Sequence, residues 1–318
     1  MRKQPLIVIV GPTASGKTTI SIKLAKELNG EIISADSMQI YKGMSISTAK
    51  PTVDEMQGVE HHLIDFLEPN ESFSVADYVK KAKETIKGIA SRGKIPILVG
   101  GTGLYISSLI DNIKFDDTSS NPEIRSRLNE LAVVKGKHYL WERLNEIDPE
   151  TAKITHENNL SRVIRALEVF EITGETLTRQ KELSRSEETP YNTVIIGLTF
   201  SDRDLLYKRI NKRVDLMIEQ GLVDEARNVY ENNELKTAHQ AIGYKELIPT
   251  FENSDSLKSC IDKIKQETRH YAKRQLTWFR RDERINWIEL DKIDNILDLI
   301  EKVKIIIAKS KILCYNKD

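Results

Sequence analysis

The stretch "LIVIVGPTASGKTTI", residues 6–20, decides the fold of this chain. Five apolar residues, mostly β-branched, run directly into a Gly-x-x-x-x-Gly-Lys-Thr pattern. This is the spacing of a P-loop, a glycine-rich turn whose backbone N–H groups cradle phosphates. A run that can form a helix follows, over residues 19–28. The stretch therefore predicts strand, phosphate-binding loop and helix, and the predicted phosphate-binding residues are Gly11, Pro12, Thr13, Ala14, Ser15, Gly16, Lys17 and Thr18.

Further apolar, β-rich runs are separated by helical patterns such as residues 74–93. Strand and helix alternating in this way predict an α/β fold, a doubly wound and mostly parallel sheet with helices on both faces. The predicted strands cover residues 6–10, 31–34, 95–99, 193–200 and 285–290.

The alternation breaks between about residues 116 and 189, where several helical patterns follow one another. Asn121-Pro122 and Asp148-Pro149 are typical helix starts, a capping residue followed by proline. We therefore expect a helical insertion at 116–189, between a first part of the P-loop core at 1–115 and its completion with C-terminal helices at 190–318.

The composition of the chain argues against a membrane-spanning protein. The chain has 318 residues, of which 39% are hydrophobic and 30% charged, and no apolar run approaches the roughly 18 residues of a membrane span. Cys260 and Cys314 form neither a metal-binding spacing nor a disulfide framework, which favours a reduced, cytoplasmic protein without a membrane partner. The net charge is zero, but residues 258–281 hold eight Lys or Arg against two acids, a local balance of +6.

Asp36 is the first candidate for chemistry beyond the P-loop. Motor and switch ATPases hold Mg²⁺ with an aspartate at the end of a second strand, but the strand at 95–99 ends in Gly100-Gly101-Thr102. Asp36 instead follows the strand at 31–34, and strand ends line the ligand crevice of such sheets. From the residues alone Asp36 fits a base, a metal ligand or a helix cap.

Seven blocks, in order, resemble the bacterial tRNA dimethylallyltransferases. They span residues 11–282 and read "GPTASGKT", "ISADSMQIYKGM…TAKP", "HHLID", "ILVGGTGLY", "RVIRALEVFEITG", "AIGYKE" and "AKRQLTWFRRD". The resemblance implies transfer of a dimethylallyl group from dimethylallyl diphosphate to N6 of the adenosine on the 3′ side of the anticodon, with tRNA (its anticodon stem-loop) as partner, Mg²⁺ as cofactor and a monomer. The P-loop would then hold the donor's diphosphate.

The same resemblance assigns roles around the P-loop. It implies that Asp36 is the base, that Thr13 lies close to both reacting groups and that the Thr18 hydroxyl ligates Mg²⁺. The helix expected after Ser201, its predicted N-cap, carries Arg209 and Arg213 one turn apart. Such a pair usually forms a solvated basic face, but the resemblance implies that Arg213 binds the leaving diphosphate, with Arg209 less certain.

Three further blocks would hold tRNA: the helix at 160–173, the segment "HQAIGYKE" with Tyr244 as a stacking ring, and the +6 segment. The apolar face of the helix leaves Arg162 and Arg165 for phosphate. Trp278 fits the core or, less readily, a platform on which a base stacks. The predicted tRNA-binding residues are Asp36, Ser37, Met38, Gln39, Thr102, Leu160, Ser161, Arg162, Val163, Ile164, Arg165, Gln240, Ala241, Ile242, Gly243, Tyr244, Lys245, Lys273, Arg274, Gln275 and Arg280.

Two further features of the sequence bear on the site, and three other functions fit the same residues. Ser45 and Ser47 stand where the family usually has Asp and Gly, and we expect them to modulate substrate contacts. His61-His62 suggests a metal, but adjacent residues of a strand point to opposite sides, so we expect no metal site there. The alternatives are a small-molecule kinase, a nucleotide-gated RNA-binding protein, and a prenyltransferase that acts on a free adenine nucleotide.

Overall fold

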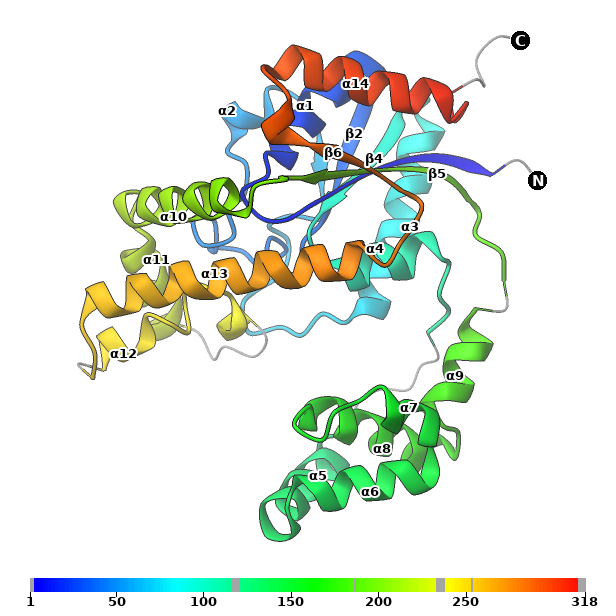
Figure 1. Cartoon of the computed structure of the whole chain (residues 1–318), viewed down its shortest axis with the longest axis vertical. Helices are drawn as coiled ribbons and strands as arrows, with labels where there is room; N and C mark the ends of the chain where they lie inside the picture. Colours follow the sequence, from blue (N-terminus) through cyan, green and yellow to red (C-terminus); the bar gives the residue numbers. More distant parts are fainter. Residues whose placement is uncertain (1–2, 116–120, 186, 233–237, 253, 314–318) are drawn as a thin grey trace. The chain divides into compact units, whose positions relative to one another are not determined.

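The computed structural model describes residues 3–115, 121–185, 187–232, 238–252 and 254–313. The expected start of the insertion at residue 116, and Cys314, lie outside these ranges. The chain divides into two compact units, one of residues 1–110 with 190–318 and one of residues 111–189 (Figure 1).

The larger unit is built on a sheet in which every described pairing is parallel, with the strand order β3-β2-β4-β1-β5-β6. This confirms the predicted doubly wound α/β fold. The strands are β1 Gln4–Val10, β2 Gly30–Ala35, β3 His61–His62, β4 Ile95–Gly100, β5 Tyr191–Thr199 and β6 Ile285–Glu289.

Two apolar layers cover the faces of the sheet because alternate residues of each strand point to opposite sides. On one face α1 (Lys17–Leu28) and α14 (Ile296–Lys309) pack against Ile7 and Ile9; on the other, α3 (Val75–Ser91) and α4 (Gly103–Ile110) pack against Leu6 and Val8 (Figure 1). All four strand residues are fully buried. The central strand β1 is therefore a continuous apolar run from Leu6 to Val10, as expected when both faces of a sheet are covered.

A third apolar cluster lies beside the carboxyl ends of the strands, and it shapes the candidate site. It joins the loop after β2 to several helices, with Tyr41, Met44 and Leu222 fully buried. The helices of this cluster are α10 Arg203–Glu219, α11 Leu222–Asn232, the 3-10 turn η1 Ala238–Gln240, α12 Ile248–Phe251 and α13 Leu257–Phe279. The larger unit also contains α2 Val53–Met56 and, after β6, a second 3-10 turn, η2 Leu290–Lys292.

The start of α10 differs from the prediction. Its N-cap is Asp202, whose side chain accepts from the Asp204 N–H, whereas the Ser201 hydroxyl bonds to Asp291. Ser201 is therefore engaged with η2, an interaction that local sequence does not reveal.

The smaller unit, residues 111–189, is helical. Asn121 and Asp148 cap helices that begin with proline, as predicted. Its apolar core gathers Leu128, Leu140 and Leu167. The helices are α5 Pro122–Lys135, α6 Lys137–Ile147, α7 Pro149–Lys153, α8 Leu160–Thr173 and α9 Leu177–Ser184.

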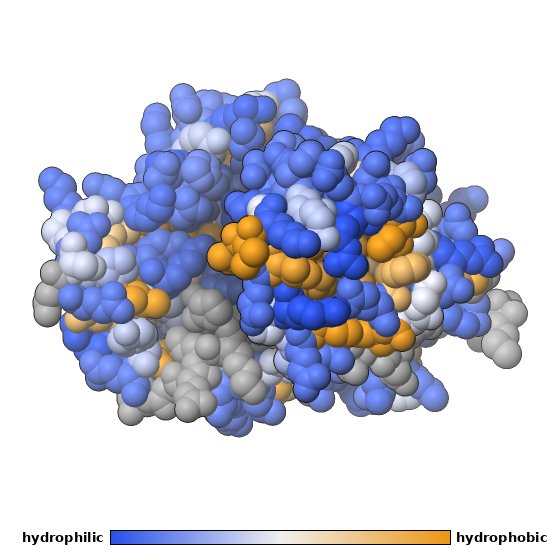
Figure 2. Space-filling view, turned by 90° about the horizontal axis from the view of Figure 1, so that it is seen from below, coloured by the Kyte–Doolittle hydropathy of each residue, from blue (hydrophilic) through white to orange (hydrophobic). Residues whose placement is uncertain are grey.

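One face of the molecule is mainly polar. On the face shown in Figure 2 hydrophilic residues predominate, and hydrophobic residues gather in small patches. No helix in the described part of the chain is long and apolar enough to cross a membrane.

Candidate active site

Three strands end at one point. The register aligns Val10 with Gly100 and Ala35 with Gly100. The next residue along each strand therefore emerges at the same edge of the sheet, so the P-loop, Asp36 and Gly101 become neighbours although they lie far apart in sequence. The carboxyl edge of a doubly wound sheet is where such folds bind ligands.

The P-loop has the backbone that its glycines permit. Gly11 adopts φ +151°, and a Cβ on it would lie 2.7 Å from the Leu198 carbonyl oxygen, so β5 leaves room only for glycine. Gly16, at φ +82°, precedes α1, which begins without a side-chain cap. The first N–H groups of α1 and its dipole therefore face the loop, an arrangement that attracts anions.

The Lys17 ammonium folds back over this loop. It donates to the carbonyl oxygens of Gly11 (2.9 Å) and Pro12 (2.8 Å). Burial, and then the nearby charge of Arg213, lower the pKa of Lys17 to about 8. A cation held in this way is stabilised when an anion arrives beside it.

Two cavities meet beside the P-loop. The larger, about 760 Å³, is lined by P-loop residues from Thr13 to Thr19. The smaller, about 510 Å³, extends toward Ser37, Met38 and residues 240–242. The residues that line both are Thr13, Asp36, Thr48, Ala49, Arg213, Met217 and Tyr271. A molecule in each cavity would therefore meet the other beside Asp36.

The Asp36 carboxylate is turned into this junction. Its Oδ1 accepts from the backbone N–H groups of Met38 (2.9 Å) and Gln39 (3.4 Å). These bonds close a turn after β2, and no α-helix begins there, so the helix-cap interpretation of Asp36 is wrong. Among the described residues, Oδ2 makes no hydrogen bond, which leaves it available to a ligand.

Arg213 opposes Asp36 across the junction. Burial lowers the pKa of Arg213, whereas the charges of Asp36 and Glu55 raise it. Within the described residues the half-buried Arg213 makes no ion pair. Arg209, one turn earlier, donates from Nε to the Ala14 carbonyl oxygen (3.0 Å) and so ties α10 to the P-loop.

Gln275 of α13 joins the P-loop to the end of β4. Its Oε1 accepts from the Thr13 N–H (2.9 Å) and its Nε2 donates to the Gly101 carbonyl oxygen (3.1 Å). Both ends of the amide are used and the residue is buried. The predicted tRNA contact of Gln275 is therefore wrong for this arrangement, in which the side chain fixes the loop.

Tyr271, four residues earlier on α13, lines both cavities and was missed from the sequence. Burial, and then the charge of Asp36, raise the pKa of its hydroxyl. Thr102, at the end of β4, accepts from the Ser37 N–H (3.0 Å) and holds that residue at the smaller cavity. Only the helical spacing of Tyr271 to Gln275 could have suggested its place.

Glu225 of α11 fixes the loop that carries both departures from the family pattern. Its Oε2 accepts from the N–H groups of Ser45 and Ile46 (both 2.8 Å), and its Oε1 from the N–H of Ser47 (3.0 Å) and the hydroxyl of Tyr244 (2.8 Å). Tyr244 is buried. The expectation that its ring stacks on a base is therefore wrong.

Known proteins resemble this chain in sequence over most of its length. A family model described as IPP transferase matches residues 39–282. The chain belongs to the IPP transferase family. It is 50% identical over 301 residues to the tRNA dimethylallyltransferase of Thermoanaerobacter sp. (strain X514), covering 94% of this chain and 96% of that one.

Solved structures of IPP transferases agree with the fold. The full-length tRNA isopentenylpyrophosphate transferase from Bacillus halodurans is 45% identical, with TM-score 0.73 and 97% of each chain covered. A eukaryotic dimethylallyltransferase acting on tRNA is 29% identical, with TM-score 0.81, covering 99% of this chain and 80% of that one.

In the helical unit of this IPP transferase, α8 contradicts part of the predicted tRNA surface. Val163 and Ile164 are buried in the core of that unit. Arg165 pairs with the fully buried Glu168 (2.7 Å), which also accepts from Arg125 (2.9 Å). Arg165 is therefore held by an ion pair with 37% of its side chain exposed, whereas Arg162 is exposed; the phosphate contacts of both stay predictions.

The remaining predicted residues of this IPP transferase lie as follows. Gln240, Ala241, Ile242 and Lys245 line the smaller cavity with Arg274. Gly243 has φ +107° and donates its N–H to Glu246 (2.8 Å). Exposed or half-buried positions hold Gln39, Leu160, Ser161, Lys273 and Arg280.

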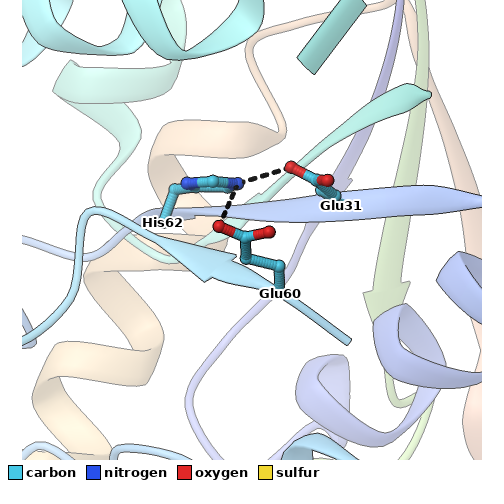
Figure 3. A group of neighbouring side chains, drawn as sticks. All are labelled: Glu31, Glu60 and His62. Carbon is cyan, nitrogen blue, oxygen red and sulfur yellow. Dashed lines mark hydrogen bonds and ion pairs between the residues drawn. The ribbon is translucent and has the colours of Figure 1, made fainter. Parts of the chain in front are cut away.

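The two histidines of β3 point apart. His61 Nδ1 bonds to the Val59 carbonyl oxygen, whereas His62 Nε2 lies 2.7 Å from Glu31 and 3.9 Å from Glu60 (Figure 3). The three residues of Figure 3 are close enough to hold a metal ion. The buried Glu31 already has two further cations, Arg92 and Lys94, and these hold its pKa down to about 2 against the effect of burial. The carboxylate is thus neutralised without a metal.

Proposed function

We propose that the chain transfers a dimethylallyl group from dimethylallyl diphosphate to N6 of the adenosine on the 3′ side of the anticodon of tRNA, and releases diphosphate. The observation that carries the proposal is Arg213, a half-buried guanidinium without an ion pair in the described structure, facing Asp36 where the two cavities meet. A donor diphosphate would supply the missing negative charge. The names of the relatives support the same activity.

The reaction follows from the two sides of the junction. The donor's diphosphate would lie in the larger cavity against the P-loop, with its allylic carbon at the junction. Adenine would enter the smaller cavity, and its N6 would attack that carbon. The N6–carbon bond forms as the carbon–oxygen bond breaks, and the diphosphate leaves with the bonding electron pair. Lys17, Arg213 and the N–H groups of α1 would stabilise the charge that grows on it.

Asp36 would take the proton. The exocyclic amine of adenine is a weak nucleophile because its lone pair is delocalised into the ring, so removal of the N6 proton makes the attack feasible. The Oδ2 atom is available to accept this proton, while Oδ1 stays hydrogen-bonded to the N–H groups that close the turn. Thr13, which lines both cavities, would lie beside both reactants, and Gln275 would hold it in place through its N–H.

A divalent cation fits the larger cavity. The Thr18 hydroxyl lines it together with the carboxylates of Asp36 and Glu55, which are the oxygen ligands that Mg²⁺ prefers. When bound, Mg²⁺ would neutralise part of the diphosphate charge. If Asp36 ligated this ion, its role would be that of a metal ligand and not that of the base.

The tRNA would reach the smaller cavity by its anticodon loop. The base must leave its stack before reaction, and in a single-stranded loop this costs only a few kcal/mol. We propose that the helical unit contacts the tRNA through Arg162, and that the enzyme acts as a monomer in the cytoplasm, where its substrate is.

One incubation tests the proposal. The protein is mixed with dimethylallyl diphosphate, Mg²⁺ and unmodified tRNA, and the RNA is digested and searched for the mass of N6-dimethylallyladenosine. A tRNA with guanosine at the acceptor position is the matched control and should stay unmodified. Modification of free AMP at a similar rate would favour the free-nucleotide alternative, and rapid ATP hydrolysis without prenyl transfer would contradict the proposal.

A further inference from the structure

The cations in the middle of α13 have partners, whereas Lys258 in its first turn and the cations at and just after its carboxyl end make no ion pair among the described residues. In the middle of the helix, Lys263 and Lys265 form ion pairs with carboxylates, and Arg269 donates to an asparagine oxygen. Toward its carboxyl end the compensation stops. In the part of the chain that the structure describes, no ion pair is made by the exposed cations Lys273, Arg274, Arg280 and Arg281. This end of the helix therefore presents uncompensated positive charge.

Trp278 lies among these cations. The sequence favours a place for it in the core, but 42% of the residue is exposed. The rest of the indole packs on the backbone of Gly103 at the start of α4, since a Cβ on that glycine would lie 2.3 Å from Trp278 Cδ1. The ring is thus supported on one side by a glycine and open elsewhere to solvent.

The indole does not line the smaller cavity, but two of its neighbours are connected to that cavity. Arg274, which lines that cavity, precedes Trp278 by four residues and so shares its face of the helix. Thr102, adjacent to Gly103, holds the Ser37 N–H, and Ser37 lines the cavity as well. A nucleic acid strand that delivers a base into the cavity would pass over this surface.

We propose that Trp278 is a stacking platform for the unpaired nucleobase next to the acceptor adenosine of an RNA loop. The inference rests on the proposed function. When the acceptor base leaves the stack, its neighbours lose a stacking partner, and an exposed indole among unpaired cations replaces it while the cations contact the phosphates. Stacking on an aromatic side chain is tolerant of sequence, and its removal weakens binding by about 5- to 150-fold per base.

The test is a double-mutant cycle on the intact protein. Trp278→Leu keeps an apolar side chain over Gly103 but removes the aromatic face; Trp278→Phe keeps a face. Each is titrated, without donor, against an anticodon stem-loop and against two stem-loops that lack the base on the 5′ or the 3′ side of the acceptor. We expect the Leu variant to bind the intact loop about 5- to 150-fold more weakly, the Phe variant to bind nearly normally, and the loss to vanish on one of the abasic loops.

Controls separate stacking from packing. Leu104→Ser removes exposed apolar surface beside Gly103 and should change the dissociation constant less than about twofold, within the range of ordinary surface substitutions. An equal loss for Trp278→Leu on all three loops, or a loss of affinity for the donor diphosphate, would mean that the indole acts through protein packing and would overturn the proposal. Because the cycle measures binding, an absence of prenyl transfer by the wild-type protein would count against the proposed function alone.

Discussion

Replacing Asp36 with asparagine tests whether Asp36 is the catalytic base while disturbing the structure little. The carboxylate uses Oδ1 to accept from the N–H groups of Met38 and Gln39, and the amide oxygen of asparagine can accept the same two bonds. The turn after β2 should therefore persist. The substitution removes the negative charge and the basic Oδ2 while leaving the shape of the junction unchanged.

The expected magnitude has two parts. Loss of a positioned base lowers turnover by about 10²–10⁴-fold, which is about 2.7–5.4 kcal/mol of activation free energy. In addition, the Asp36 charge raises the pKa values of Lys17 and Arg213 against burial. Its removal therefore lowers the pKa of Lys17 further below about 8, which weakens donor binding at alkaline pH. Near pH 6.5 this second part should be small.

The assay is single-turnover prenyl transfer at about pH 6.5, with saturating donor and tRNA, across a series of Mg²⁺ concentrations. If Asp36 is the base, the Asp36→Asn variant stays slow throughout and its substrate affinities change little. If Asp36 is a Mg²⁺ ligand, excess Mg²⁺ restores part of the rate, because a weakened site fills by mass action. Near-wild-type turnover at any Mg²⁺ concentration would refute the assignment.

Because the pKa of Lys17 is lowered to about 8, the lysine loses its charge above that pH. The kcat/KM for the donor should therefore fall by up to about tenfold per pH unit there. The same fall in kcat/KM in the Lys17→Arg variant would contradict this. Glu225→Gln should lower the free energy of unfolding by about 2–3 kcal/mol, because one carboxylate oxygen is replaced by an N–H donor that faces other donors. Urea unfolding measures this change. The matched control is Glu219→Gln at an exposed position, which should change the free energy of unfolding little. Arg162→Ala should reduce the salt dependence of tRNA binding by about one unit of log–log slope. Arg165→Ala should instead destabilise the helical unit by about 1–3 kcal/mol, and a reversed outcome for the two arginines would show that the ion pair of α8 is not maintained in solution.

Local patterns predicted the elements well because their causes are local. The helix expected at 160–173 is α8 with the same bounds, since its apolar residues recur at helical spacing. The predicted strands agree with the observed ones to within two residues at each end, because continuous apolar runs mark strands buried on both faces. β3, only His61–His62, has no periodicity to detect and was not among the predicted strands.

The site was less predictable because its parts are joined through space. Gln275 reaches the Thr13 N–H across 262 positions of sequence, and Glu225 reaches the N–H of Ser45 across 180. No spacing rule links such pairs. The exposure of Trp278 depends in the same way on the backbone of a distant glycine. Residues in a contiguous motif could be found from the sequence, whereas those that support the motif from other elements required the structure.

The uneven compensation along α13 has an electrical consequence for the whole molecule. Residues 258–281 carry +6 while the complete chain carries zero, so all other residues together carry −6. A polyanion that approaches elsewhere is on average repelled, and the repulsion is felt over about 10 Å at 0.1 M salt. Residues 258–281 are therefore a concentrated source of attraction in a chain without net charge, which helps to orient an incoming strand before any base is recognised.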